Sequence, residues 1–169
     1  MTSSSPSGSD HSAVATRRAD NPGVRIPPPI VYLAAFLAGL GLQRLAPLPF
    51  LPRPIALGLG GALSACGVTV NLASIPTMLR GHGTLNTSAA SAALVTSGPY
   101  RYSRNPMYVG LTLLYAGLAC ALSVVWALPL LILALLDTTM RVITPEERYL
   151  ERKFGEAYRG YKARVRRWL

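Results

Sequence analysis

Charged residues are scarce in this sequence. They make up 14% of the 169 residues, whereas an ordinary soluble domain carries roughly 25%. Half of the residues are hydrophobic, and they are gathered in long uncharged blocks instead of being spread along the chain. Blocks of this length are typical of helices that cross a lipid bilayer. The composition therefore argues against a soluble globular protein and predicts a membrane protein.

Cysteine and histidine are almost absent. Cys66 and Cys120 both lie inside apolar blocks, and His11 and His82 are isolated from each other and from the cysteines. Neither pair has the spacing of a zinc site, a haem site or a disulfide framework. We therefore expect no bound metal, and we expect both cysteines to act as small apolar side chains within helices.

Acidic residues are also few. The chain has seven of them against 17 lysines and arginines, which gives a formal net charge of +10. Nine of the 17 basic residues lie at or after Arg141, next to an apolar block, and no aromatic and basic groove for a single strand is evident. Anionic lipid explains such a basic face better than nucleic acid does. We predict contact with the bilayer and no nucleic-acid partner.

The first 26 residues contain no apolar stretch. They are rich in serine, with aspartate, proline and glycine, which predicts a disordered tail and not a signal peptide. Arg17, Arg18 and Arg25 precede the first apolar block. Positive residues flanking a membrane helix favour its cytoplasmic end. The sequence thus predicts a tail over residues 1–26, a cytoplasmic N-terminus and a membrane domain over residues 27–169.

The apolar blocks predict an all-α integral membrane protein with four transmembrane helices. The uncharged run 106–136 has 31 residues, and as one straight helix it would be ~46 Å long against a ~30 Å hydrocarbon core. A helical hairpin shortens it and leaves the arginine-bearing segment before it and the basic tail after it on the same, cytoplasmic side. Both termini are then cytoplasmic. The expected helices cover about 30–45, 55–79, 106–121 and 125–142.

A basic amphipathic helix is expected after the fourth span. Leu150, Phe154, Tyr158 and Tyr161 recur at spacings of three and four, with arginines and lysines between them. This pattern predicts an interfacial helix over residues 145–166 on the cytoplasmic membrane surface. Its expected start is a Thr-x-x-Glu capping box, formed by Thr144 and Glu147 around Pro145.

One polar segment stands out between the apolar blocks. Residues 94–110 contain three tyrosines and two arginines. Asn105 can cap a helix whose first residue is Pro106. The backbone N–H groups and the positive dipole end of that helix would then lie near Arg101 and Arg104. Such a helix start is suited to binding an anion or another polar ligand.

Two separated motifs carry a family resemblance. The first is Gly98-Pro-Tyr-Arg-Tyr-Ser-Arg-Asn-Pro-Met-Tyr-Val-Gly110. The second is Glu146-Glu147 followed by Phe154-Gly155-x-x-Tyr158-x-x-Tyr161-x-x-Arg164-Val165. In this order, from about Leu94 to the end, they resemble the integral-membrane methyltransferases. That group contains the isoprenylcysteine carboxyl methyltransferases and their phospholipid N-methyltransferase relatives. The resemblance implies S-adenosylmethionine as the cofactor and a lipophilic acceptor at the cytoplasmic membrane face.

The resemblance also implies the residues of the active site. Leu94 and Val95 match positions that line the adenosyl group, and Glu146 matches the acid at the cofactor's amino-acid end. Arg104 and Arg141 are the candidates for binding an anionic acceptor, and with Glu146 they form the predicted catalytic set. The structural alternatives are capping by Asn105 and Glu147, and arginines that reach the membrane interface. The predicted cofactor-binding residues are Leu94, Val95, Gly98, Tyr100, Asn105, Pro106, Met107, Tyr108, Glu146 and Glu147.

The chemistry of the acceptor decides what else the site needs. Methyl transfer from a sulfonium cation to a carboxylate annihilates charge, so it needs positioning and exclusion of water but no base. An amine acceptor must lose a proton, and a carboxylate base then helps. The expected reaction is carboxyl O-methylation of an isoprenylcysteine-like substrate. The alternatives are phospholipid N-methylation, a steroid-reductase-like enzyme that uses NADPH, and a non-catalytic lipid-binding protein.

Overall fold

The computed structural model describes residues 26–81 and 93–169. The predicted tail, apart from Ile26, lies outside the described residues, as do residues 82–92. Within the two described ranges every regular element is a helix and none is a strand. The predicted all-α class is therefore confirmed for this part of the chain.

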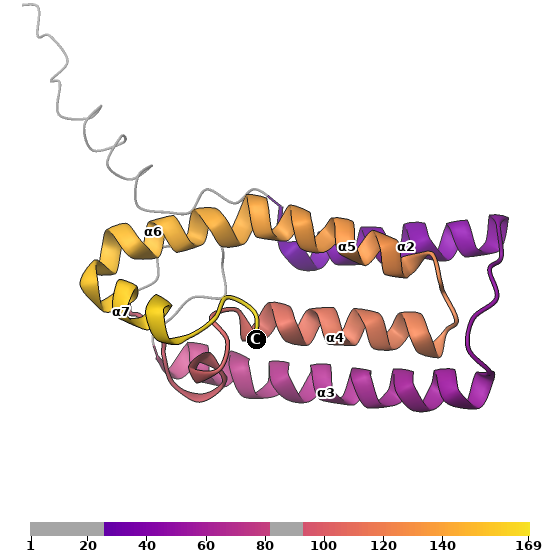
Figure 1. Cartoon of the computed structure of the whole chain (residues 1–169), viewed down its shortest axis with the longest axis horizontal. Coiled ribbons are helices and arrows are strands. Elements are labelled where there is room, and N and C mark those ends of the chain that lie inside the picture. The colour runs from indigo at the N-terminus through magenta and orange to yellow at the C-terminus, as the bar shows by residue number, and fades with distance from the viewer. Residues whose placement is uncertain (1–25, 82–92) are drawn as a thin grey trace, which may run out of the picture.

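Four apolar helices form two layers (Figure 1). Helix α3 (Arg53–Arg80) packs along α4 (Pro106–Ala121) in the most extensive helix contact, and α2 (Pro28–Leu45) packs beside α5 (Ala127–Thr138). By length and composition, α2, α3 and the helical run Ala127–Phe154 are suited to crossing a membrane, and α4 is a shorter apolar helix. The fold is that of an integral membrane protein. A fourth complete span by α4 stays a prediction.

Glycines allow α3 and α4 to approach closely. A Cβ atom added at Gly67 would lie 2.6 Å from the carbonyl oxygen of Gly110, and one added at Gly117 would lie 2.6 Å from the backbone nitrogen of Ser64. Small residues favour helix association in lipid because they let two backbones make van der Waals contact. The glycine-bearing face of α3 therefore packs inside the chain, against α4.

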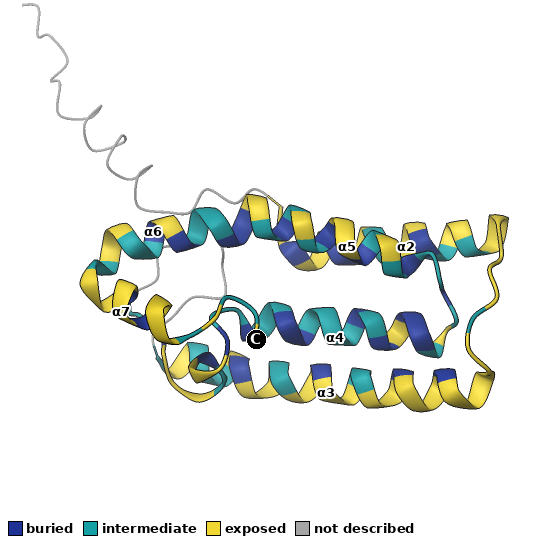
Figure 2. Ribbon diagram, viewed as in Figure 1, coloured by how far each residue is buried: buried dark blue, intermediate teal, exposed yellow. Residues whose placement is uncertain are grey.

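Aromatic side chains fill the space between the two layers. The rings of Tyr32 and Phe36 on α2 meet the ring of Tyr115 on α4 edge to face, at centroid distances of 6.0 Å and 5.2 Å. Tyr32 and Tyr115 are buried. Buried residues lie mainly on the inner faces of the helices and exposed leucines on the outer faces (Figure 2). Exposed apolar faces of this extent fit a lipid environment.

The C-terminal region differs from the expected single interfacial helix over 145–166. A π-helical turn (η2, Thr139–Ile143) joins α5 to α6 (Thr144–Phe154), which extends the line of α5 (Figure 1). The chain then reverses at Gly155, with φ +53° and ψ −124°, into α7 (Glu156–Arg164). Residues other than glycine rarely adopt this backbone conformation. The predicted pattern of spacings was present, but Gly155 divides it between two helices.

The predicted capping box is also wrong. The backbone before Thr144 is already helical, and the Thr144 hydroxyl donates to the carbonyl oxygen of Thr139 at 2.8 Å instead of capping α6. Pro145 is the second residue of α6, just after the π-helical turn. Because proline has no N–H and its ring clashes with the preceding turn, the regular hydrogen-bond ladder is interrupted there.

Candidate active site

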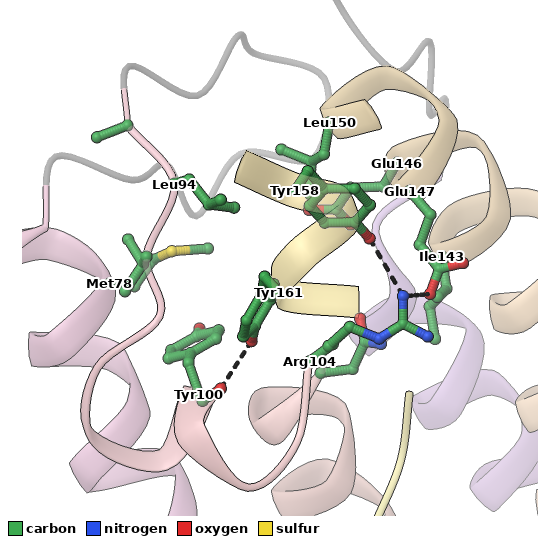
Figure 3. Close-up of a pocket in the computed structure, with 13 residues that line it drawn as sticks. Met78, Leu94, Tyr100, Arg104, Ile143, Glu146, Glu147, Leu150, Tyr158 and Tyr161 are labelled. Carbon is green, nitrogen blue, oxygen red and sulfur yellow. Dashed lines mark hydrogen bonds and ion pairs between the residues drawn. The ribbon is translucent and has the colours of Figure 1, made fainter. Parts of the chain in front are cut away.

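Two adjoining cavities lie at one end of the helical bundle. The smaller has a volume of about 50 Å³ and is enclosed by the segment before α4 and by helices α6 and α7 (Figure 3). The larger has a volume of about 180 Å³ and reaches the start of α2 at Pro27–Pro29. Residues from three separate parts of the chain, the end of α3, the segment before α4 and helix α6, line both cavities, so the two form one composite site. These shared residues are Met78, Tyr100, Arg104, Asn105 and Glu146.

Most of the predicted site residues meet at these cavities. Leu94, Val95 and Glu147 line the smaller one, and Pro106, Met107 and Tyr108 line the larger. Gly98 does not line either cavity. It begins the short 3-10 helix η1 (Gly98–Arg101) with φ +57°, and a Cβ there would lie 3.0 Å from the Thr77 hydroxyl oxygen. The conformation and the close approach both favour glycine, and the turn places Tyr100 in the site.

Arg141 lies outside both cavities. Its side chain is 76% exposed, and its Nε atom is 2.8 Å from Oδ1 of Asp137 one helical turn earlier. The structure therefore does not bring Arg141 together with Arg104 and Glu146. The alternative interpretation, an arginine that reaches the membrane interface, stays a prediction.

Glu147 is buried between two arginines. Its Oε1 is 3.1 Å from Nη1 of Arg104 and accepts a hydrogen bond from Nε of Arg167 at 3.0 Å, and its Oε2 accepts from Nη2 of Arg167 at 2.7 Å. The side chains of Arg104 and Glu147 are each 9% exposed. Burying such an ion pair costs desolvation energy. Removing only one partner strongly destabilises the fold, because it leaves the other charge buried without a partner. Glu147 therefore fixes Arg104 at the wall of the smaller cavity.

The last five residues form a strap across the start of α4, and we call residues 165–169 the strap. The amide nitrogen of Arg104 donates to the carbonyl oxygen of Arg166 at 2.9 Å, and Nδ2 of Asn105 donates to that of Arg167 at 3.0 Å. Asn105 occupies the N-cap position of α4, with Pro106 at the first helical position, but makes no side-chain capping bond. Its side chain is instead held against the strap.

Three tyrosines line the inner wall of the smaller cavity. The Tyr161 hydroxyl donates to the carbonyl oxygen of Tyr100 at 2.7 Å, and the Tyr158 hydroxyl accepts from Nη1 of Arg104 at 3.4 Å (Figure 3). Burial raises the pKa of Tyr158 and Tyr161 to about 12 and that of Tyr100 further. All three hydroxyls stay protonated near neutral pH, so none of them acts as a base.

Glu146 is the carboxylate that faces both cavities. It lies in α6 at the cavity end of the bundle, after the uncharged run that ends at Leu136. Among the described residues it makes no salt bridge, in contrast to Glu147. Burial, with a further contribution from the charge of Glu147, raises the pKa of Glu146 to about 7. A carboxylate with this pKa can accept and release a proton near neutral pH.

Several lining residues were absent from the predicted set. Met78 comes from the end of α3, and Tyr158 and Tyr161 from α7. The two tyrosines belong to the second sequence motif, and their spacing places them on one helix face. Nothing in the local sequence around Arg167 indicates its ion pair with Glu147, because the two residues are distant in the chain.

Comparison with known proteins agrees with this geometry. The profile of a family described as phospholipid methyltransferase matches residues 55–157, more than half of the chain. An uncharacterized protein of Haemophilus influenzae is 67% identical over 27 residues, which are 16% of this chain and 43% of the relative. The matched stretch thus covers less than half of that relative's length. No solved structure matches the chain.

Proposed function

Because the chain belongs to the phospholipid methyltransferase family, we propose that it transfers a methyl group from S-adenosylmethionine to the amine of a membrane lipid. The observation that carries the amine is Glu146. It faces both cavities, makes no salt bridge within the described residues, and has a pKa of about 7. A lipid amine needs such a base, whereas a carboxylate acceptor does not.

The polar and apolar groups around the cavities suit the cofactor. Nε of Arg104 is buried and has no hydrogen-bond partner among the described residues. A carboxylate such as that of the methionine part would satisfy it through a charge-assisted bond. With the cofactor bound, Leu94 and Val95 would pack against the adenosyl group, and the ring of Tyr100 would contact the sulfonium. When bound, S-adenosylmethionine supplies an electrophilic methyl group on a positively charged sulfur.

We assign Glu146 the role of general base, because a lipid amine must lose a proton before it can be methylated. A lipid ammonium first loses a proton, which the carboxylate of Glu146 accepts. With S-adenosylmethionine bound, the free electron pair of the nitrogen would form the new N–C bond, and the electrons of the broken C–S bond would stay on sulfur. General-base catalysis of this kind contributes typically 10²–10⁴-fold. Tyr100 and Asn105 line the same space and help to hold the amine and exclude water.

Carboxyl O-methylation, the reaction expected from the sequence, is the second candidate. It is favoured by the unpartnered Nε of Arg104, which suits an anionic acceptor. However, the charge of Arg104 is already offset by Glu147, and Arg141 lies outside both cavities. Two arginines were expected to bind the carboxylate, and only one lies at the site. We therefore place the amine first.

The test uses purified full-length protein in nanodiscs that contain phosphatidylethanolamine, with S-adenosylmethionine carrying a labelled methyl group. We expect labelled phosphatidyl-N-methylethanolamine, and we expect the rate to rise with pH with an inflection near 7. Glu146→Gln should lower the rate by about 10²–10⁴-fold and remove that inflection. Glu151→Gln, on the same helix but paired with Lys162 at the surface, is the matched control and should keep the wild-type rate.

The competing functions predict different results. The protein could instead methylate a prenylcysteine carboxylate, at a rate that does not change from pH 6 to 9, and fail to methylate phosphatidylethanolamine. That result would show that the acceptor is a carboxylate and not an amine. Calorimetric titration with S-adenosylhomocysteine and with NADPH separates the remaining alternatives. Binding of NADPH alone would favour a reductase, and binding of neither would favour a non-catalytic protein.

A further inference from the structure

An apolar groove runs along the side of the bundle between α2 and α4. It has a volume of about 170 Å³. At its polar end lies Pro29, which also lines the larger polar cavity, so the groove and the cavity adjoin. From there Leu33 and Phe36 of α2 face Leu111 and Leu118 of α4. The groove thus leads from the candidate active site along the membrane-facing side of the bundle.

The register of α4 makes the path continuous. Tyr108 lines the larger cavity, and Leu111, Tyr115 and Leu118 line the groove. These residues follow one another at steps of three, four and three, which keeps them on one face of a helix. At 1.5 Å per residue, the path from Tyr108 to Leu118 is ~15 Å long. A chain lying along this face would stay in contact with α4 from the cavity to the far end of the groove.

The walls of the groove present hydrocarbon and ring surface. The hydroxyls of its two tyrosines are already engaged, Tyr32 with Oγ1 of Thr112 at 3.2 Å and Tyr115 with the carbonyl oxygen of Ala127 at 3.0 Å. The rim is open, because Leu33 is 59% and Leu118 is 41% exposed. With no charged group and no free polar group in its lining, the groove suits an apolar chain and not a polar ligand.

A larger groove on the other side of α4 is not joined to the site in this way. It lies between α4 and α5, has a volume of about 560 Å³ and shares no lining residue with either polar cavity. Trp168 and Leu169 of the strap line it, and the bond from Asn105 to Arg167 holds the strap there. The groove between α2 and α4 is therefore the one that continues from the polar site.

We propose that the groove between α2 and α4 binds a hydrocarbon chain of the methyl acceptor, which enters the larger cavity with its headgroup past Pro29. The acceptor is then a bilayer lipid that stays in the membrane during the reaction, and Leu33 at the rim contributes to selecting it. The assignment of this lipid as the acceptor rests on the proposed function. The binding of a hydrocarbon chain in the groove does not.

Photolabelling tests the groove without requiring turnover. The full-length protein is placed in nanodiscs that contain phosphatidylethanolamine with a diazirine in one acyl chain, and the labelled residues are identified by mass spectrometry. We expect label to be enriched at Leu33, Phe36 and Leu118. Label spread evenly over the exposed leucines, including Leu133 on α5, would show only bulk lipid and overturn the proposal. Crosslinking of a second copy across the groove would overturn it as well.

Matched substitutions then connect the groove to the reaction. Leu33→Trp adds bulk at the rim, whereas Leu37→Trp adds the same bulk one turn later on α2, at a residue that is 56% exposed and outside the groove. Ile132→Trp is the control in the groove between α4 and α5. We expect only Leu33→Trp to lower labelling and to raise the KM for a long-chain lipid, by about tenfold, with unchanged binding of S-adenosylhomocysteine.

The outcomes separate the two proposals. A short-chain phosphatidylethanolamine should be methylated equally by the wild type and by Leu33→Trp, because it does not occupy the groove. Equal effects of Leu33→Trp and Leu37→Trp on labelling would overturn the proposal that the groove binds a hydrocarbon chain, even if the enzyme methylates phospholipid. Enriched labelling that Leu33→Trp lowers, in a protein that methylates no phospholipid, would support the groove and reject the proposed function.

Discussion

The carboxylate of Glu147 holds Arg104 at the wall of the smaller cavity. It is the salt-bridge partner of Arg104, whose side chain is only 9% exposed. Breaking such a buried pair by removing one partner costs about 3–5 kcal/mol. We predict that Glu147→Gln lowers the free energy of unfolding by about 3 kcal/mol, measured by unfolding in mixed detergent micelles. The double variant Arg104→Gln/Glu147→Gln should lose less than the sum of the single losses.

A control for this prediction lies on the surface. Glu156 pairs with Arg159, and both side chains are largely exposed, so solvent screens the pair and Glu156→Gln should leave stability unchanged. Equal stabilities of Glu147→Gln and Glu156→Gln would mean that the buried pair contributes nothing to the fold.

Glu146 should make stability depend on pH. Its pKa rises from the ordinary value of 4.5 to about 7 in the folded protein because burial disfavours the charged form. Between these values the folded state binds more protons than the unfolded state, so stability falls as pH rises. We predict that the Tm of the wild type, relative to Glu146→Gln, decreases from about pH 4.5 to about pH 7 and is constant on either side. A difference that does not vary over this window would contradict the burial of Glu146.

Individual site residues could be predicted from the sequence where they belong to a short, local motif. Glu146, Arg104, Tyr100 and Asn105 were predicted from two motifs, and all line the cavities. Arg167 was missed because its role depends on the return of α7 and the strap to Glu147. Arg141 was included because of the resemblance to the membrane methyltransferases, but its position on the helix points it to Asp137.

Among the helices, the contact of α3 with α4 gives the sharpest test. A Cβ at Gly67 would lie 2.6 Å from both the carbonyl oxygen of Gly110 and the backbone nitrogen of Leu114, so it would push two backbones apart. Overpacking of this kind typically costs about 1–3 kcal/mol. We predict a loss of that size for Gly67→Ala, measured by unfolding in mixed micelles. Gly61→Ala on the same helix meets nothing within 4 Å and should be neutral or slightly stabilising.

Hydropathy predicted the positions of the helices better than their joints. The expected helices at about 30–45, 55–79 and 106–121 can be compared with Pro28–Leu45, Arg53–Arg80 and Pro106–Ala121, since long uncharged blocks and initial prolines decide these elements. The joints of the last helices depend on backbone conformation. The π-helical turn before Pro145 and the positive φ at Gly155 do not change the hydrophobic periodicity. From the sequence pattern alone, the segment therefore looks like one continuous amphipathic helix.

The whole molecule has one basic end. Of the lysines and arginines in residues 26–81 and 93–169, two, Arg44 and Arg53, lie at the end where α2 joins α3, and twelve lie at the cavity end. Loops rich in lysine and arginine stay cytoplasmic. Pro27–Pro29 at the start of α2 also line the larger cavity with Glu146, so the start of α2 lies at this same end. The cavities should therefore open at the cytoplasmic face, where the cofactor would be supplied.

This orientation can be tested by labelling single cysteines in intact cells and in inverted membrane vesicles. In a background with Cys66→Ser and Cys120→Ala, we predict that Ile26→Cys and Ala163→Cys react with a membrane-impermeant maleimide only from the cytoplasmic side. Leu48→Cys, in the segment between α2 and α3, should react only from the opposite side. Labelling of Ile26→Cys and Ala163→Cys from different sides would require an odd number of crossings between them. That result would exclude four crossings by α2, α3, α4 and α5 and would place the two halves of the composite site on opposite membrane faces.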